Sequence, residues 1–148
     1  MYKCVAICLC FIINNLNAQE YSATYRVSFI GEWTVESHPT DYPAFAHFSP
    51  LVGSTHNESL TLWGPGEFAS PGIELMAETG GVNTLQTEIN QHISSLTAEN
   101  FLLGSGPDAD EIVSFEFSIS LSHPFVTIVT MIAPSPDWFV GIHGESLL

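Results

Sequence analysis

The sequence predicts an all-β domain, an antiparallel β-sandwich that carries a short helical insertion. Within residues 112–121, apolar side chains alternate strictly with Ser and Glu from Val113 onward, which is typical of a strand with one buried face. Residues 125–133 are richer in apolar and β-branched side chains than residues 112–121, which indicates a central strand. Strands do not alternate with helices, which favours antiparallel pairing, and 148 residues allow one domain.

The first part of this domain is predicted to be one strand followed by a long loop. Residues 21–33 alternate, with Tyr25, Val27 and Phe29 on one face, so we expect a half-buried strand there. Residues 36–56 contain three prolines that remove backbone donors, which favours an ordered loop over regular structure.

Two short helices are expected after this loop. Ser70 followed by Pro71 is a helix-start signal, and residues 72–79 end at a Gly-Gly stop. Asn83 is a candidate cap for the second helix. Its apolar stripe, spaced for a helix, is expected in the core: Leu85, Ile89, His92, Ile93 and Leu96.

The remaining segments are an acidic turn and the last strands. Residues 104–111 are rich in Gly and Asp, and their carboxylates are expected to be solvated rather than tuned as the acid and base of a glycosidase. After the corner at residues 134–136, residues 138–142 begin another strand.

The N-terminus is predicted to be an export signal. Lys3 precedes an apolar run at residues 4–13, and a cleavage site is expected after Ala18. The run is too short to span a membrane; the structural alternative is a buried N-terminal strand. This assigns residues 1–18 to a signal peptide and residues 19–148 to the domain. All three cysteines lie in the signal, so the mature chain is expected to hold no disulfide.

The charge balance restricts the partners. The chain has 2 Lys and Arg against 16 Asp and Glu, a formal net charge of −14. Binding to nucleic acid or to anionic lipid depends on clustered basic side chains, so neither is expected as a partner. The six histidines show no zinc-binding spacing, and no serine lies in a nucleophile elbow.

Asp137 is the candidate functional residue, because it lies between Pro136 and Trp138 on a proline-stiffened corner. One carboxylate does not make a calcium site, which needs six to eight oxygen ligands. An Asx-turn is the structural alternative. A hydrolase that uses Asp137 with a loop histidine such as His47 would need the two side chains within about 2.6–3.2 Å.

Three segments resemble the spondin domain: residues 25–43, residues 46–74 and, above all, residues 123–142 with the sequence HPFVTIVTMIAPSPDWFVGI. This domain is the amino-terminal module of the extracellular-matrix proteins F-spondin and mindin, and it also occurs in exported bacterial proteins. The resemblance covers about residues 23–148. It implies an eight-stranded sandwich similar to C2 domains, with a calcium site in the loops at one end.

The resemblance also implies which residues bind the metal. Asp137 matches the aspartate of the family motif, and the second acidic position falls on Ser118, two residues from Glu116 on the same strand face. Asp137 and Glu116 are therefore the candidate metal ligands. The third acidic position lies beyond Leu148, so the domain is expected to be C-terminally incomplete, without its last strands.

The implied function is that of a secreted, non-enzymatic binding or adhesion module, with calcium as the expected ion. It would act at the cell surface or in the extracellular matrix, on an extracellular protein or glycan, without membrane insertion after signal removal. The alternatives are the hydrolase that uses Asp137 and a structural module without a ligand.

Overall fold

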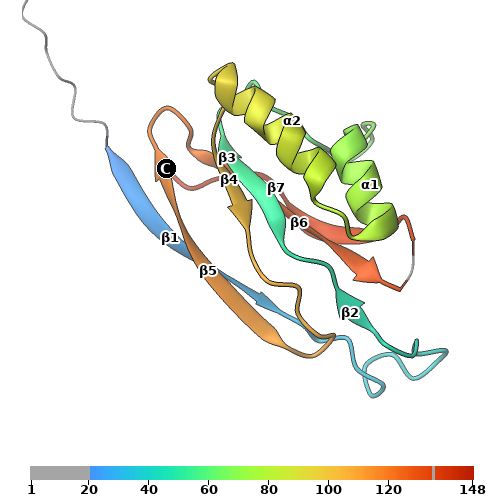
Figure 1. The fold of residues 1–148 in the computed structure, drawn as a ribbon. Helices are drawn as coiled ribbons and strands as arrows, with labels where there is room; N and C mark the ends of the chain where they lie inside the picture. Colours follow the sequence, from blue (N-terminus) through green and yellow to red (C-terminus); the bar gives the residue numbers. More distant parts are fainter. Residues whose placement is uncertain (1–20, 135) are drawn as a thin grey trace, which may run out of the picture.

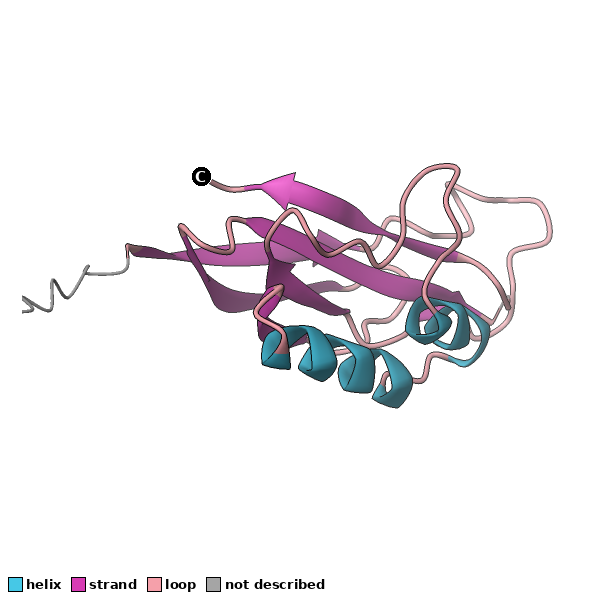
Figure 2. Ribbon diagram, turned by 90° about the horizontal axis from the view of Figure 1, so that it is seen from above, coloured by secondary structure: helices cyan, strands magenta, loops and turns pink. Residues whose placement is uncertain are grey.

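The computed structural model describes residues 21–134 and 136–148. The predicted signal peptide and the three cysteines therefore lie outside the described residues. The described chain forms three layers: a two-stranded ribbon, a five-stranded sheet and a pair of helices (Figures 1 and 2). The elements are β1 (Ser22–Ile30), β2 (His47–Phe48), β3 (Val52–His56), α1 (Pro71–Thr79), α2 (Asn83–Ser94), β4 (Ala98–Leu103), β5 (Ile112–Ser120), β6 (Phe125–Ala133) and β7 (Phe139–Ser146).

All strand pairs are antiparallel, as the sequence predicts. The ribbon pairs β1 with β5 over nine residues each. In the larger sheet β6 is central: it pairs with β2 and β3 along one edge and with β7 along the other, and β4 follows β3. The apolar composition of β6 fits this central position, because seven of its nine residues are buried.

One core lies between the ribbon and the larger sheet. The alternating side chains of β1 and β5 point into it, which confirms the period-two pattern of both segments. Phe117 and Ile119 of β5 meet Val126 and Ile128 of β6 there. Leu121, the last apolar residue of the pattern, lies beyond the strand and is exposed.

A second core lies between the larger sheet and the helices, which cover its other face (Figure 2). Ile73 and Met76 of α1 and Leu85 and Ile89 of α2 are fully buried against it. The helices therefore form a third layer, and the expected sandwich with a helical insertion is confirmed. Neither helix in the described residues has the length and apolar character needed to cross a membrane.

The expected loop at residues 36–56 is partly wrong, because it contains β2 and β3. All five residues of β3 are buried between its neighbours β4 and β6. Gly53 permits this packing, since a Cβ there would lie 1.9 Å from the carbonyl oxygen of Thr127. Pro50 falls in the break between β2 and β3, where no ladder hydrogen bond is lost.

The end of the second helix also differs from the expectation. The helix ends at Ser94, and Leu96 lies beyond it with a positive φ of 61° and 75% of its surface exposed. At the other end, Asn83 is the first helical residue, and the cap position belongs to Val82 without a side-chain hydrogen bond. By contrast, the start signal at Ser70 is confirmed, because its side chain accepts a hydrogen bond from Ile73 N.

Candidate functional site

Asp137 lies in the connection between β6 and β7, next to α1. Its backbone N donates a hydrogen bond to Ala77 O at 3.1 Å, and the neighbouring Trp138 O accepts one from Ile132 N at 2.9 Å. Asp137 has a φ of 69°, a left-handed conformation that aspartate tolerates better than most residues. The connection is therefore attached both to the sheet and to the helix layer.

A recess forms where this connection meets the helix. We call it the Asp137 recess, with a volume of about 270 Å³. Glu74 of α1 lines it together with Asp137, and both side chains are exposed to solvent. No lysine or arginine contributes to the lining, so the recess favours a cationic group. Its lining residues are Phe68, Ala69, Ile73, Glu74, Ala77, Asp137 and Phe139.

The helix that carries Glu74 is held at its N-terminus by a residue of α2. Glu88 Oε2 accepts a hydrogen bond from Ser70 Oγ, and Glu88 Oε1 accepts one from Gly72 N, both at 2.7 Å. Gly72 allows the close contact, since a Cβ there would meet Leu85 Cα at 2.6 Å. The Glu88 carboxylate therefore satisfies backbone and cap groups that a helix start leaves unpaired.

An exposed aromatic side chain lines the recess, that of Phe68, which is fully exposed. Trp138, the residue after Asp137, is 65% exposed but is not among the lining residues. Large apolar side chains in water next to polar groups are characteristic of surfaces that bind partners. Neither Glu74 nor Phe68 was a sequence candidate, because only the packing of α1 beside the β6–β7 connection brings them to Asp137.

The structure does not bring Glu116 to this recess. Glu116 lies on β5 with its side chain exposed, and its Oε1 accepts a hydrogen bond from Arg26 Nη2 of β1 at 2.8 Å. Ser118 lies two residues further along β5, with its hydroxyl 3.5 Å from that of Thr24. The two sheets separate this outer face of the ribbon from the helix layer beside Asp137.

The pair required by the hydrolase hypothesis is not formed either. His47 lies on β2, and its Nδ1 is 2.7 Å from Phe45 O. Within residues 21–134 and 136–148, no hydrogen bond links His47 to Asp137. The described hydrogen bonds therefore give the hydrolase hypothesis no support from a pair of Asp137 with His47.

The residues around Asp137 supply only part of a calcium donor set. Glu74 and Asp137 are the two carboxylates that line the recess. Across the described part of the chain there is no group of three or more His, Cys, Asp or Glu side chains placed to hold a metal. Calcium takes six to eight oxygen ligands, so these residues do not by themselves make a complete calcium site.

Comparison with known proteins decides the family. The family model described as Spondin_N matches residues 23–148. The chain belongs to the spondin N-terminal family. It is 33% identical to Spondin-1 of Rattus norvegicus over 132 residues, which is 85% of this chain and 16% of that protein. It is 34% identical to Spondin-2 of Rattus norvegicus over 130 residues, 84% of this chain and 39% of that protein. Human Spondin-2 is 32% identical over the same length.

The spondin match confirms the resemblance drawn from residues 25–43, 46–74 and 123–142. The chain spans less than half of the length of these relatives. The described residues form seven strands, where the resemblance implies eight. The family membership therefore applies to this domain, whereas the activities of the whole relatives concern much longer proteins.

Proposed function

We propose that this spondin domain is a secreted, non-enzymatic binding module that attaches to a protein partner at the cell surface or in the extracellular matrix. Membership of the spondin family supports this role, since the family is one of matrix proteins. The Asp137 recess is the proposed contact surface. It supports binding rather than catalysis because its carboxylates have no histidine or other base hydrogen-bonded to them among the described residues.

The observation that carries the proposal is the combination of two carboxylates with the exposed aromatic side chain of Phe68 on a firmly held frame. Glu74 is positioned by a capped helix, and Asp137 by hydrogen bonds of its connection to both α1 and the sheet. Such preorganised groups lose little entropy on binding. The recess therefore suits a cationic group of the partner, with Phe68 as an apolar contact in its lining.

A matrix-binding assay tests this role. The folded domain and three variants, each with one carboxylate replaced by an amide, are applied to matrix deposited by cultured cells. The bound fraction of each protein is measured as a function of its concentration. Asp137→Asn and Glu74→Gln should each weaken binding about tenfold, equivalent to about 1.4 kcal/mol. The matched control is Glu78→Gln, which removes the same charge from an exposed position of α1 outside the recess.

Asparagine is the appropriate replacement at Asp137, because it also tolerates the positive φ. Loss of binding in all three variants would point to general charge, and equal binding by Asp137→Asn and the unchanged domain would refute the recess as contact surface. No binding of any form to cell-derived matrix would refute the adhesive role itself.

Calcium dependence stays a prediction, because the described residues of the recess supply only two carboxylates of the six to eight oxygen ligands that calcium takes. It is tested by thermal melting with calcium and with a chelator. An ion that binds only the native state raises the melting temperature as its concentration increases. We expect a rise that Asp137→Asn abolishes and Glu78→Gln preserves. An unchanged melting temperature at millimolar calcium would remove calcium from the proposed function while leaving the matrix assay to judge the recess.

A further inference from the structure

A chain of hydrogen bonds through three residues connects β3, β6 and β7. His56 is the last residue of β3, and its ring stacks on that of Phe125 at a centroid distance of 6.0 Å. Its Nε2 lies 2.8 Å from Thr127 Oγ1 of β6, and the same oxygen accepts a hydrogen bond from Gly144 N of β7 at 3.0 Å. His56 and Thr127 are 3% and 1% exposed, so this chain is closed off from bulk water.

The partners of His56 determine which of its ring nitrogens carries a proton. Nδ1 lies 2.8 Å from Asn57 O, a carbonyl oxygen that can only accept, so Nδ1 carries the hydrogen. In the neutral ring Nε2 is therefore the acceptor, and it takes the hydroxyl hydrogen of Thr127. The direction of the chain follows: Gly144 N donates to Thr127 Oγ1, and this hydroxyl donates to Nε2.

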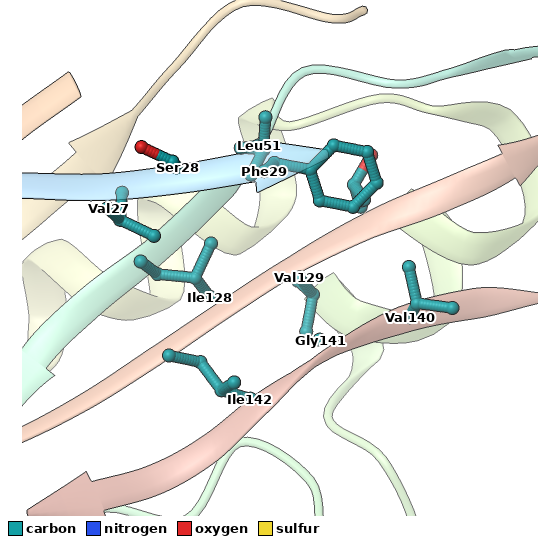
Figure 3. Close-up of a pocket in the computed structure, with 10 residues that line it drawn as sticks. Val27, Ser28, Phe29, Leu51, Ile128, Val129, Val140, Gly141 and Ile142 are labelled. Atoms are coloured by element: carbon teal, nitrogen blue, oxygen red, sulfur yellow. The ribbon is translucent and has the colours of Figure 1, made fainter. Parts of the chain in front are cut away.

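The chain acts at an irregular point of the β6–β7 ladder. The register is regular up to the pair of Ile128 in β6 and Ile142 in β7 (Figure 3). Beyond this pair Thr127 lies opposite two residues, His143 and Gly144, which is the arrangement of a β-bulge. The bond from Gly144 N to Thr127 Oγ1 fastens the bulge to β6. It faces β6, so it does not depend on how the chain continues after β7.

The charged groups that act on His56 are three other histidines, on β7, in the turn after β5 and on α2: His143, His123 and His92. Burial is the largest cause that lowers the pKa of His56 below 6.5, and repulsion by these rings lowers it further. The hydrogen bond to Asn57 O opposes both causes. Among the described residues none of the four rings forms an ion pair with a carboxylate, so a proton on His56 is not compensated locally.

A proton on Nε2 removes the acceptor on which the chain depends. Nε2 and the Thr127 hydroxyl then both direct a hydrogen at the same space, and the hydroxyl has to turn away. A buried donor without an acceptor destabilises the closed form, and a buried positive ring does so more strongly. Opening the bulge admits water to both groups and gives up the bond from Gly144 N.

We propose that His56, Thr127 and Gly144 form an acid-sensitive latch, which holds the bulge of β7 closed at neutral pH and opens it reversibly when His56 takes up a proton. One proton from the solvent binds to Nε2 in each opening, and no covalent bond changes. The opening is local, so the two cores stay folded. The latch is separate from the Asp137 recess and does not depend on the function proposed for it.

Amide hydrogen exchange at Gly144, followed by NMR and corrected for the intrinsic exchange rate at each pH, measures the fraction of open latch. Because the ring has the higher pKa in the open form, acid favours opening. The open fraction should be constant above pH 6.5 and rise by up to about tenfold per pH unit below it, the limit for one proton. Low urea should leave exchange at Gly144 unchanged while it speeds exchange at the buried Ile89, which requires global unfolding.

Variants assign the opening to the latch. His56→Gln keeps an acceptor for the Thr127 hydroxyl but takes up no proton, so exchange at Gly144 should stay slow at every pH. The matched control is His143→Gln, which removes an exposed histidine beside Gly144 and should keep the pH dependence. Thr127→Val keeps the shape of the side chain but deletes the acceptor of Gly144 N. Exchange at Gly144 should then be fast and independent of pH, which tests the latch even where His56→Gln does not fold.

Any of three results would overturn the latch. The first is an unchanged pH dependence of exchange at Gly144 in His56→Gln or in Thr127→Val. The second is a ring of His56 that carries its hydrogen on Nε2 above pH 6.5, as read from the nitrogen-15 spectrum of the imidazole. The third is exchange at Gly144 that depends on urea as steeply as exchange at Ile89, because the opening would then belong to global unfolding.

Discussion

Removing the carboxylate of Glu88 should cost the domain a large part of its stability, although the side chain is only half-buried. Its two oxygens accept hydrogen bonds from Ser70 Oγ and Gly72 N, both at 2.7 Å. A hydrogen bond to a charged group contributes about 1.5 to 3 kcal/mol. Since Glu88 is only half-buried, we take the lower value for each bond and expect Glu88→Ala to lower the free energy of unfolding by about 3 kcal/mol.

Urea unfolding measures this loss. With a slope of about 2 kcal/mol per molar urea, the midpoint should fall by about 1.5 M without a change in slope. Glu78→Ala is the control, because Glu78 is an exposed acid on the same pair of helices without a described hydrogen bond; it should change stability by less than about 0.5 kcal/mol. Ser70→Ala combined with Glu88→Ala should cost less than the two single changes added together, since they share one bond.

The reasoning would be refuted if Glu88→Ala shifted the midpoint no more than Glu78→Ala does. Additive effects of Ser70→Ala and Glu88→Ala would likewise contradict a shared cap. In the first case α1 would be held by its buried face alone, and the Glu88 contacts would contribute nothing to the position of Glu74. In the second case Ser70 and Glu88 would stabilise the domain independently of each other.

Three further outcomes are expected. Glu116→Gln should change stability by less than about 1 kcal/mol in urea unfolding, because its ion pair with Arg26 is exposed on both sides. Burial lowers the pKa of His56 below 6.5, so the unfolded state takes up its proton first as pH falls; stability should be complete above pH 6.5, fall below it, and lose this pH slope in His56→Gln. Gly53→Ala should cost more than about 3 kcal/mol or abolish soluble expression, because its Cβ would collide with the Thr127 carbonyl.

The sequence predicts most clearly the strands that have one buried face and one solvent-exposed face. β1 and β5 alternate because the ribbon has solvent on its outer side, and that contrast is visible in the order of residues alone. β6 could be predicted from its largely apolar and β-branched sequence, which reflects burial on both faces.

β3 was missed although it is buried on both faces, because its buried residues are polar. Ser54, Thr55 and His56 are each at most 3% exposed. Their polar groups are satisfied by partners distant in the chain: Thr55 Oγ1 accepts from Asn100, and His56 Nε2 lies 2.8 Å from Thr127 Oγ1. A buried polar strand of this kind resembles a loop until its hydrogen-bond partners are known.

The residues of the candidate site also differ in whether the sequence alone could identify them. Asp137 could be found from its neighbours, since the prolines around it define the corner on which it lies. Glu74 could not, because its contribution depends on α1 packing beside the β6–β7 connection. The sequence places Glu116 on a strand face, but that face belongs to the ribbon, on the other side of the sandwich.

The helix layer links the stability of this domain to its proposed binding surface. The cap at Ser70 and Glu88 fixes the start of α1, and Ala77 O near its end holds the backbone of Asp137. A change at Glu88 should therefore weaken both folding and matrix binding, whereas Asp137→Asn should weaken binding alone. These separate responses distinguish a damaged fold from a lost contact at the recess.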